Sequence, residues 1–172
     1  MLIPCAAAAL TIGSSMMAFA ATGWLQEDEI WHYYDRNGDE VTSSWKKSSN
    51  DWFWLDEDGE MAVSQLVEDN DNYYYVNESG VMVRNQWREL ENDDPQDDDE
   101  SDTVWYYFGA DGKAYKAKDS GRVNFKTIVR ADGVTKKYAF DEEGKMLYGW
   151  IDEQGERQTG DDAWQTGLYY LG

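Results

Sequence analysis

The chain has 172 residues, a single cysteine, 15% aromatic residues and a formal net charge of −20. A chain this acidic repels phosphate, so nucleic acid is excluded as an expected partner. Strongly charged chains that stay disordered contain few aromatic residues, but this one has nine tryptophans, which favours an ordered scaffold with an acidic surface.

Residues 1–21 have the pattern of a secretory signal peptide. The first 23 residues carry no charged side chain, and an alanine-rich apolar run leads to AFA at 18–20, an Ala-x-Ala cleavage site. A membrane anchor is the alternative, but GSS at 13–15 interrupts the run. Cleavage would remove Cys5 and leave a secreted chain, 22–172, that neither spans a membrane nor contains a disulfide or a cysteine zinc site.

An aromatic motif then repeats along the chain. Each copy is an aromatic stretch followed by a polar turn that ends in glycine, and an anchor residue lies seven positions before each of the first three copies. The anchors Trp24, Trp45, Leu66 and Trp87 follow one another at intervals of 21 residues, a period that predicts stacked repeats. The copies read WHYYDRNG at 31–38, WFWLDEDG at 52–59, YYYVNESG at 73–80, WYYFGADG at 105–112 and, degraded, KYAFDEEG at 137–144.

Each aromatic stretch alternates as a β-strand does. Trp31 and Tyr33 lie on one face of the predicted strand and His32 on the other, while 35–38 has the composition of a turn. We predict a β-hairpin whose return strand runs from this turn toward Trp45. The residues on the second face are assigned to the structural core: Tyr34, Phe53, Leu55, Tyr74, Val76, Tyr106 and Phe108.

The later repeats are less regular. An acidic run at 91–102 interrupts the fourth repeat, and like-charge repulsion predicts a solvated loop there. The segment 113–145 is locally basic, and the chain ends where another hairpin starts, so we expect further repeats beyond it. The glycine in every turn rules out a coiled coil. The predicted repeats span 24–44, 45–65, 66–86, 87–118, 119–149 and, incomplete, 150–172.

The order of these residues resembles the choline-binding, or cell-wall-binding, repeat family. Gly23 and Trp24, then WHY at 31–33 and Gly38, follow the spacing of that repeat, and GKMLYGW at 144–150 matches its end. The resemblance covers 23–172, least closely at 113–136. It implies an all-β solenoid of stacked β-hairpins on or in the bacterial cell wall, which holds choline of teichoic acid in aromatic cages between hairpins. Related repeats in glucan-binding proteins hold α-glucan instead.

A quaternary ammonium has no hydrogen to donate, so its recognition rests on aromatic faces and on shape. Each such site is weak, and several copies add avidity. Leu66 at an anchor, Lys137 at a cage position, and the acidic run between Trp87 and Trp105 depart from the family pattern, as does the loss of the pre-anchor glycine at Ser44, Gln65 and Gln86. The cage residues carried over from the family are Trp24, Trp31, Tyr33, Trp45, Trp52, Trp54, Tyr73, Tyr75, Trp87, Trp105 and Tyr107.

Catalysis finds no support in the sequence, which contains no nucleophile motif, phosphate loop or metal-ligand cluster. The turn acids do not have EF-hand spacing, and turn chemistry explains them. We therefore expect no enzyme, no cofactor and no metal. Three functions remain open. The chain is a secreted attachment module for choline, teichoic acid or a wall polysaccharide, with α-glucan as the alternative ligand, or it is a structural repeat spacer on the bacterial surface that meets a protein partner. The third is the attachment part of a wall hydrolase whose catalytic domain is not in this chain.

Overall fold

The structure is a computed structural model that describes residues 22–92, 101–118 and 122–172. The predicted signal peptide and most of the acidic run lie outside these ranges. The chain divides into two compact units. The first unit comprises Met1–Gln65 and Val76–Met82, and the second comprises Leu66–Tyr75 and Val83–Gly172.

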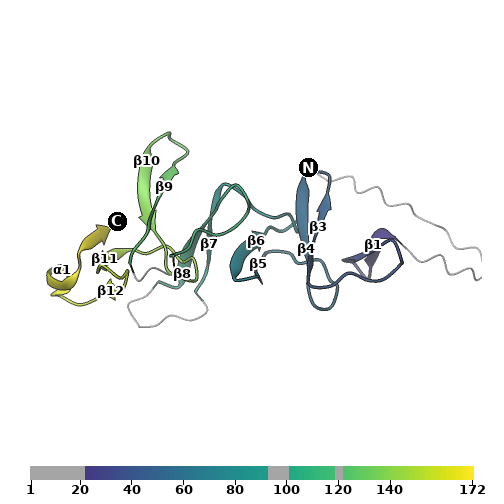
Figure 1. Ribbon diagram of the computed structural model, residues 1–172, viewed down its shortest axis with the longest axis horizontal. Coiled ribbons are helices and arrows are strands. Elements are labelled where there is room, and N and C mark those ends of the chain that lie inside the picture. The colour runs from purple at the N-terminus through teal and green to yellow at the C-terminus, as the bar shows by residue number, and fades with distance from the viewer. Residues whose placement is uncertain (1–21, 93–100, 119–121) are drawn as a thin grey trace, which may run out of the picture. The chain divides into compact units, whose positions relative to one another are not determined.

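The described residues form antiparallel β-hairpins, which confirms the all-β hairpin-repeat prediction (Figure 1). A small sheet at the C-terminal end has the order β12 (Arg157–Gln158), β11 (Gly149–Ile151), β13 (Tyr169–Leu171), with helix α1 (Ala163–Thr166) between β12 and β13 in the chain. The hairpins are β1 (Gly23–Glu27) with β2 (Ile30–Tyr34), β3 (Ser44–Ser48) with β4 (Asp51–Leu55), β5 (Gln65–Asp69) with β6 (Asn72–Val76), β7 (Gln86–Glu91) with β8 (Thr103–Phe108), and β9 (Phe125–Val129) with β10 (Thr135–Ala139).

The hairpin turn lies before each aromatic strand and not after it. β1 reaches β2 through the two residues Asp28 and Glu29, both with positive φ (48° and 73°), as a tight two-residue hairpin turn requires. The turn at 35–38 instead leads to an isolated bridge between Tyr34 and Glu40. The predicted return strand toward Trp45 is therefore wrong, because the anchor segment itself is the partner strand.

The predicted alternation between two faces is confirmed by burial. Leu55, Val76 and Phe108 are completely buried, whereas the tryptophans and tyrosines of the opposite face are half-buried or exposed. Tyr34, on the first described hairpin, departs from the prediction and is half-buried. The remaining residues assigned to the core are also buried: Phe53, Tyr74 and Tyr106.

Backbone hydrogen bonds join consecutive hairpins within each unit. In the first unit the N–H of Met61, two residues after a turn glycine, donates to the carbonyl of Trp31 at 2.8 Å. In the second unit the N–H of Met146 donates to the carbonyl of Trp105 at 2.7 Å. This repeated step is the linkage that a solenoid of hairpins needs. The same bond joins Met82 to Trp52 and Ala114 to Tyr73, each at 2.8 Å.

The missing pre-anchor glycines do not interrupt the repeat. Gly23 has a φ of 90°, and where Ser44, Gln65 and Gln86 replace that glycine, the residue one position earlier takes up the positive φ. Each of these residues also donates its N–H to a carbonyl in the turn after the next aromatic strand, as Ser43 does to Asp56 at 2.7 Å. The three residues with positive φ are Ser43 (44°), Ser64 (51°) and Asn85 (51°).

The acidic run closes a single hairpin. The ladder between β7 and β8 extends to Glu91 opposite Thr103, and beyond it the N–H of Asn92 donates to the carbonyl of Asp102 at 2.9 Å. The aromatic strand resumes in register after the insertion, as predicted. Residues 93–100 of the run lie outside the described ranges.

The last strand was expected to begin a new hairpin, but it completes a sheet with earlier strands. β13 pairs with β11, which places Tyr170 opposite Trp150. Trp150 follows a glycine with a φ of 75°, so it has the same setting as Trp24. Within residues 22–92, 101–118 and 122–172, no helix combines the length and the apolar character needed to cross a membrane.

Candidate aromatic ligand-binding site

Each anchor tryptophan lies against the ring directly across its hairpin. Trp24 is in register with Tyr33, and their ring centres are 5.3 Å apart at 76°. Side chains directly opposite each other in an antiparallel ladder have Cβ atoms about 5 Å apart, so the register alone brings such rings into contact. The equivalent pairs are Trp45–Trp54 at 5.2 Å, Trp87–Tyr107 at 5.1 Å and Trp150–Tyr170 at 5.2 Å.

The following hairpin supplies a third ring. Phe53 lies 5.3 Å from Trp24, and its position is one residue before the cross-strand ring of its own hairpin. Tyr138 holds the equivalent position in the hairpin after Trp87, at 4.8 Å. Three rings from two hairpins therefore converge in each unit. The same step recurs between Phe125, which holds the anchor position of β9, and Tyr169 at 5.1 Å.

Trp87 is the centre of the larger aromatic cluster. Besides Tyr107 and Tyr138, its ring lies near those of Trp105 and Phe140, with ring centres 6.4 Å and 6.0 Å away. The acidic run was expected to keep Trp87 and Trp105 apart. It does not, because it closes the hairpin that carries both of them. Tyr115 extends the cluster, with its ring 5.0 Å from that of Tyr107.

Burial affects the chemistry of this cluster. Desolvation, and to a smaller extent the neighbouring Tyr115, raise the pKa of Tyr107 above its ordinary value. Trp105, in contrast, is 39% exposed. The cluster therefore combines rings that are shielded from water with one ring, that of Trp105, that is open to solvent.

The third hairpin lacks an aromatic anchor, as the sequence indicated. Leu66, Tyr73 and Tyr75 pack against a buried core that includes Phe108. The ring of Tyr75 lies 6.2 Å from that of Phe108, and burial raises the pKa of Tyr73. These tyrosines contribute to packing in the second unit.

Most of the predicted cage residues are thus brought together in pairs and clusters. Trp24 meets Tyr33, Trp45 meets Trp54, and Trp87 meets both Trp105 and Tyr107. Trp31 on β2 and Trp52 on β4 are half-buried. The ammonium of Lys47 lies 6.0 Å from the centre of a Trp52 ring. Whether each residue binds a ligand stays a prediction.

The sequence reasoning missed several rings of these clusters. Phe53 had been assigned to the core, and it is buried, yet it also contacts Trp24. Tyr138 is not among the predicted cage residues, because its copy of the motif begins with Lys137 and not with an aromatic residue. The signal that could have found Phe53 and Tyr138 is their shared place, the second position of the aromatic motif. Trp150 and Tyr170 could have been found from the Gly-Trp pair at 149–150.

The turn acids satisfy backbone groups. The Oδ1 atom of Asp35 accepts the N–H of Asn37 at 2.7 Å and the N–H of Asp39 at 3.0 Å. These bonds favour the charged carboxylate and lower the pKa of Asp35. Across the described ranges, no group of three or more histidine, cysteine, aspartate or glutamate side chains is arranged to hold a metal ion.

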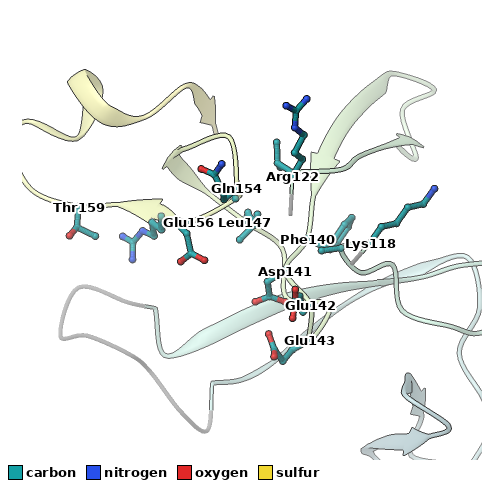
Figure 2. A pocket seen from close by; sticks show the side chains of 14 residues that line it. Lys118, Arg122, Phe140, Asp141, Glu142, Glu143, Leu147, Gln154, Glu156 and Thr159 are labelled. Atoms are coloured by element: carbon teal, nitrogen blue, oxygen red, sulfur yellow. The ribbon is translucent and has the colours of Figure 1, made fainter. Parts of the chain in front are cut away.

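A polar cavity of 480 Å³ in the second unit is a different kind of hollow. Figure 2 shows the acids Asp141, Glu142 and Glu143 together on the turn after β10, with Arg122 on another segment of the wall. Burial raises the pKa of Asp141 to about 6, although the N–H of Lys145 donates to its carboxylate at 2.7 Å. The volume suits a small ligand, but a mostly polar wall is not the aromatic surface that a quaternary ammonium needs.

Comparison with known proteins identifies two repeat profiles in this chain. The family profile described as "Choline-binding repeat" matches residues 41–87, and the profile described as "Putative cell wall binding repeat" matches residues 22–39 and 101–114. A comparison with curated proteins gives no significant match.

Solved structures include similar folds. CbpJ from Streptococcus pneumoniae is 21% identical with a TM-score of 0.52, and the match covers 82% of this chain but only 44% of CbpJ. A truncated alternansucrase from Leuconostoc mesenteroides is 20% identical with a TM-score of 0.51, and the match covers 73% of this chain and 10% of that enzyme. The choline-binding domain of Spr1274 from Streptococcus pneumoniae is 27% identical with a TM-score of 0.41, covering 55% of this chain and 95% of that domain.

The matched segments contain all four sequence-predicted anchors, Trp24, Trp45, Leu66 and Trp87, together with the aromatic strand that follows each of them. The resemblance predicted from the sequence is confirmed. Residues 22–39, 41–87 and 101–114 match repeats of the choline-binding, cell-wall-binding family.

Proposed function

We propose that the chain is a non-catalytic module that attaches to choline-bearing teichoic acid or a related polysaccharide of a bacterial cell wall. The observation that carries this proposal is the recurrence of one three-ring arrangement. An anchor tryptophan, its cross-strand ring and a ring of the next hairpin meet in both units, as Trp24–Tyr33–Phe53 and as Trp87–Tyr107–Tyr138.

The physical chemistry of these clusters favours a cationic ligand without hydrogen-bond donors. A ring face attracts a cation by about 0.5–1 kcal/mol when exposed and ~2 kcal/mol when desolvated. The net charge of −20 adds a long-range attraction for cations. One such site binds weakly, so attachment to a polymer would depend on several sites acting together.

The same proposal places the chain outside the cell, secreted by means of the segment 1–21 and held at the wall or cell surface. Attachment is its whole role in this view, and any catalysis would belong to another domain or protein. The alternatives are an α-glucan ligand for the same rings, or a repeat spacer without a ligand that contacts a protein.

The test is a choline titration of the purified chain, followed by tryptophan fluorescence. The informative variants are Trp24→Leu and Trp87→Leu, because Leu66 already holds an anchor position in a folded hairpin. Trp164→Leu is the matched control, since Trp164 is 63% exposed on α1 and lies outside the clusters. We expect saturable quenching at millimolar choline that both anchor variants weaken and the control retains, with unchanged circular dichroism.

No fluorescence change up to high choline would exclude that ligand. The same titration with α-glucan oligosaccharides would then distinguish the remaining functions. A response to glucan would keep the rings as a saccharide site. No response to either ligand would make them structural and the chain a spacer.

A further inference from the structure

The residue directly after the anchor position is a cation in three hairpins. Its place is defined by the strand register, one step beyond the anchor pair. The three cations and the aromatic residues opposite them are Lys46 with Phe53, Arg88 with Tyr106, and Lys126 with Tyr138.

Each of these cations reaches back to a ring that precedes its own hairpin. The ammonium nitrogen of Lys46 lies 5.2 Å from the centre of the Tyr33 ring. The guanidinium carbon of Arg88 lies 5.8 Å from the centre of the Tyr75 ring. The ammonium nitrogen of Lys126 lies 5.1 Å from the centre of the Tyr115 ring. All three contacts are within the distance of about 6 Å at which a ring face attracts a cation.

These three side chains are partly withdrawn from solvent, as Arg84, Lys116, Lys145 and Arg157 also are. Lys46, Arg88 and Lys126 are half-buried, whereas Lys47 and Lys136 are exposed. A long cationic side chain becomes half-buried when its stem lies along an apolar surface and its charge stays near the edge. The contacts are therefore built into the packing of the hairpins.

Arg88 is the cation of the three with a buried donor atom, Nε, that lacks a hydrogen-bond partner in the part of the chain that the structure describes. A buried donor without a partner costs free energy, and contact with the Tyr75 ring face offsets part of the cost of placing the charge there. At this step Leu66 has replaced the anchor tryptophan, and the guanidinium supplies a cation from within the protein.

A cation is not a requirement of the strand position. Val67 and Ile151 hold the same place in their hairpins, and both are buried apolar residues. Strand formation therefore does not require the positive charge at Lys46, Arg88 and Lys126.

The rings that these lysines contact belong to the proposed ligand clusters. Tyr33 is the cross-strand partner of Trp24. Tyr115 packs against Tyr107, the cross-strand partner of Trp87. A cation on one of these faces leaves less of the negative ring potential for a second cation.

We propose that Lys46 and Lys126 are internal competitors that lower the affinity of the Trp24 and Trp87 clusters for a quaternary ammonium ligand, and that Arg88 is a permanent internal cation at the hairpin whose anchor is Leu66. The inference rests on the proposed function, which it extends by naming the residues that set the strength of each site.

The test measures choline affinity separately at the two clusters. Indole N–H resonances of Trp24 and Trp87, assigned with the Trp24→Leu and Trp87→Leu variants, follow a titration with choline chloride at constant ionic strength. Lys46→Met removes the charge and keeps the length of the side chain. It should raise the affinity at Trp24 by about 2- to 5-fold, the equivalent of one exposed cation–π contact, and leave the affinity at Trp87 unchanged.

Lys126→Met should do the reverse, strengthening binding at Trp87 by a similar factor and leaving Trp24 unchanged. Lys136→Met is the control for net charge, because Lys136 is exposed and opposite Ile128, so its removal makes the protein more acidic without touching a cluster. A small equal gain at both clusters in this control gives the background that is subtracted from the other two variants.

The outcomes separate the two proposals. Choline binding by the wild-type chain with the same site affinities in Lys46→Met and Lys126→Met would overturn the inference and leave the proposed function intact. A gain equal to that of Lys136→Met would also overturn it. The absence of choline binding in the wild-type chain and in every variant would overturn the proposed function, and the competition with it.

Discussion

The ring of Trp87 lies 4.8 Å from the ring of Tyr138, which belongs to the next hairpin along the chain. Along the chain, the strands β8 and β9 and their connecting segments lie between these two residues. The same contact joins Trp24 to Phe53 at 5.3 Å in the first unit. Rings of the proposed ligand clusters therefore also hold consecutive hairpins together, and ligand binding and stability depend on the same side chains.

Replacing Trp87 should destabilise the second unit. Trp87→Ala removes ring contacts with Trp105, Tyr107, Tyr138 and Phe140, and we expect a loss of about 2–4 kcal/mol in the free energy of unfolding. Urea denaturation followed by far-ultraviolet circular dichroism measures it. Trp164→Ala makes the same change at a ring that is 63% exposed and should cost no more than about 0.5 kcal/mol. Equal losses in both variants would contradict the central position of Trp87.

Much of the fold could be predicted because the 21-residue period and the two-face alternation are local properties of the sequence. Phe53 and Leu55 are buried as the alternation required. The turn of the hairpin was misplaced because Asp35 to Gly38 has stronger turn composition than Asp28 and Glu29. In the structure the latter pair accepts positive φ without a glycine.

The site was predicted only in part, because cross-strand neighbours depend on register. Trp24 and Tyr33 were both named, but their contact follows from the pairing of β1 with β2. The contact of Tyr138 with Trp87 and the contact of Lys46 with Tyr33 each join two hairpins, so neither could be predicted from the sequence of a single repeat. They become visible when equivalent positions of consecutive hairpins are aligned through their ladders.

The stability of the second unit should depend on the protonation of Asp141. Burial raises its pKa from 3.8 to about 6, so the folded state keeps a proton that the unfolded chain has already lost. The free energy of unfolding should therefore fall as pH rises from about 4 to about 6, by roughly 2–3 kcal/mol from this group. Asp141→Asn should remove that loss, because an amide keeps the acceptor for the Lys145 N–H and carries no charge.

Urea unfolding at a series of pH values measures this difference. The Asp141→Asn variant should match the wild-type chain near pH 4 and exceed its stability above pH 6. Asp35→Asn is the opposite case, since backbone hydrogen bonds lower the pKa of Asp35, and that variant should lose stability relative to wild type as pH rises. A constant difference between Asp141→Asn and wild type at every pH would show that the Asp141 charge is not the cause.

Asp56 should act mainly through its acceptor oxygen. The Oδ1 atom of Asp56 accepts the N–H of Asp58 at 3.0 Å and the N–H of Glu60 at 2.9 Å. Asp56→Ala loses both bonds and should lower the free energy of unfolding by about 1–2 kcal/mol. Asp56→Asn keeps the acceptor, as Asn77 does in the following repeat, and should stay within about 0.5 kcal/mol of wild type. Thermal unfolding of the two variants compares them, and equal losses would assign the effect to charge.

Two turn glycines should differ although their backbones are alike. Gly80 and Gly133 have φ values of 74° and 80°, a region that costs a non-glycine residue roughly 1–2 kcal/mol. A Cβ atom at Gly80 would lie 2.8 Å from the end of the Met61 side chain and 3.1 Å from the carbonyl oxygen of Ala62, whereas at Gly133 it would meet nothing within 4 Å. Gly80→Ala should therefore cost about 1–3 kcal/mol more than Gly133→Ala, because the backbone of the preceding repeat has to move. Urea denaturation of both variants measures the difference. Equal costs would mean that only the backbone conformation matters and that the turns do not pack closely on their neighbours, while a larger cost at Gly80 supports close packing between consecutive hairpins in the first unit.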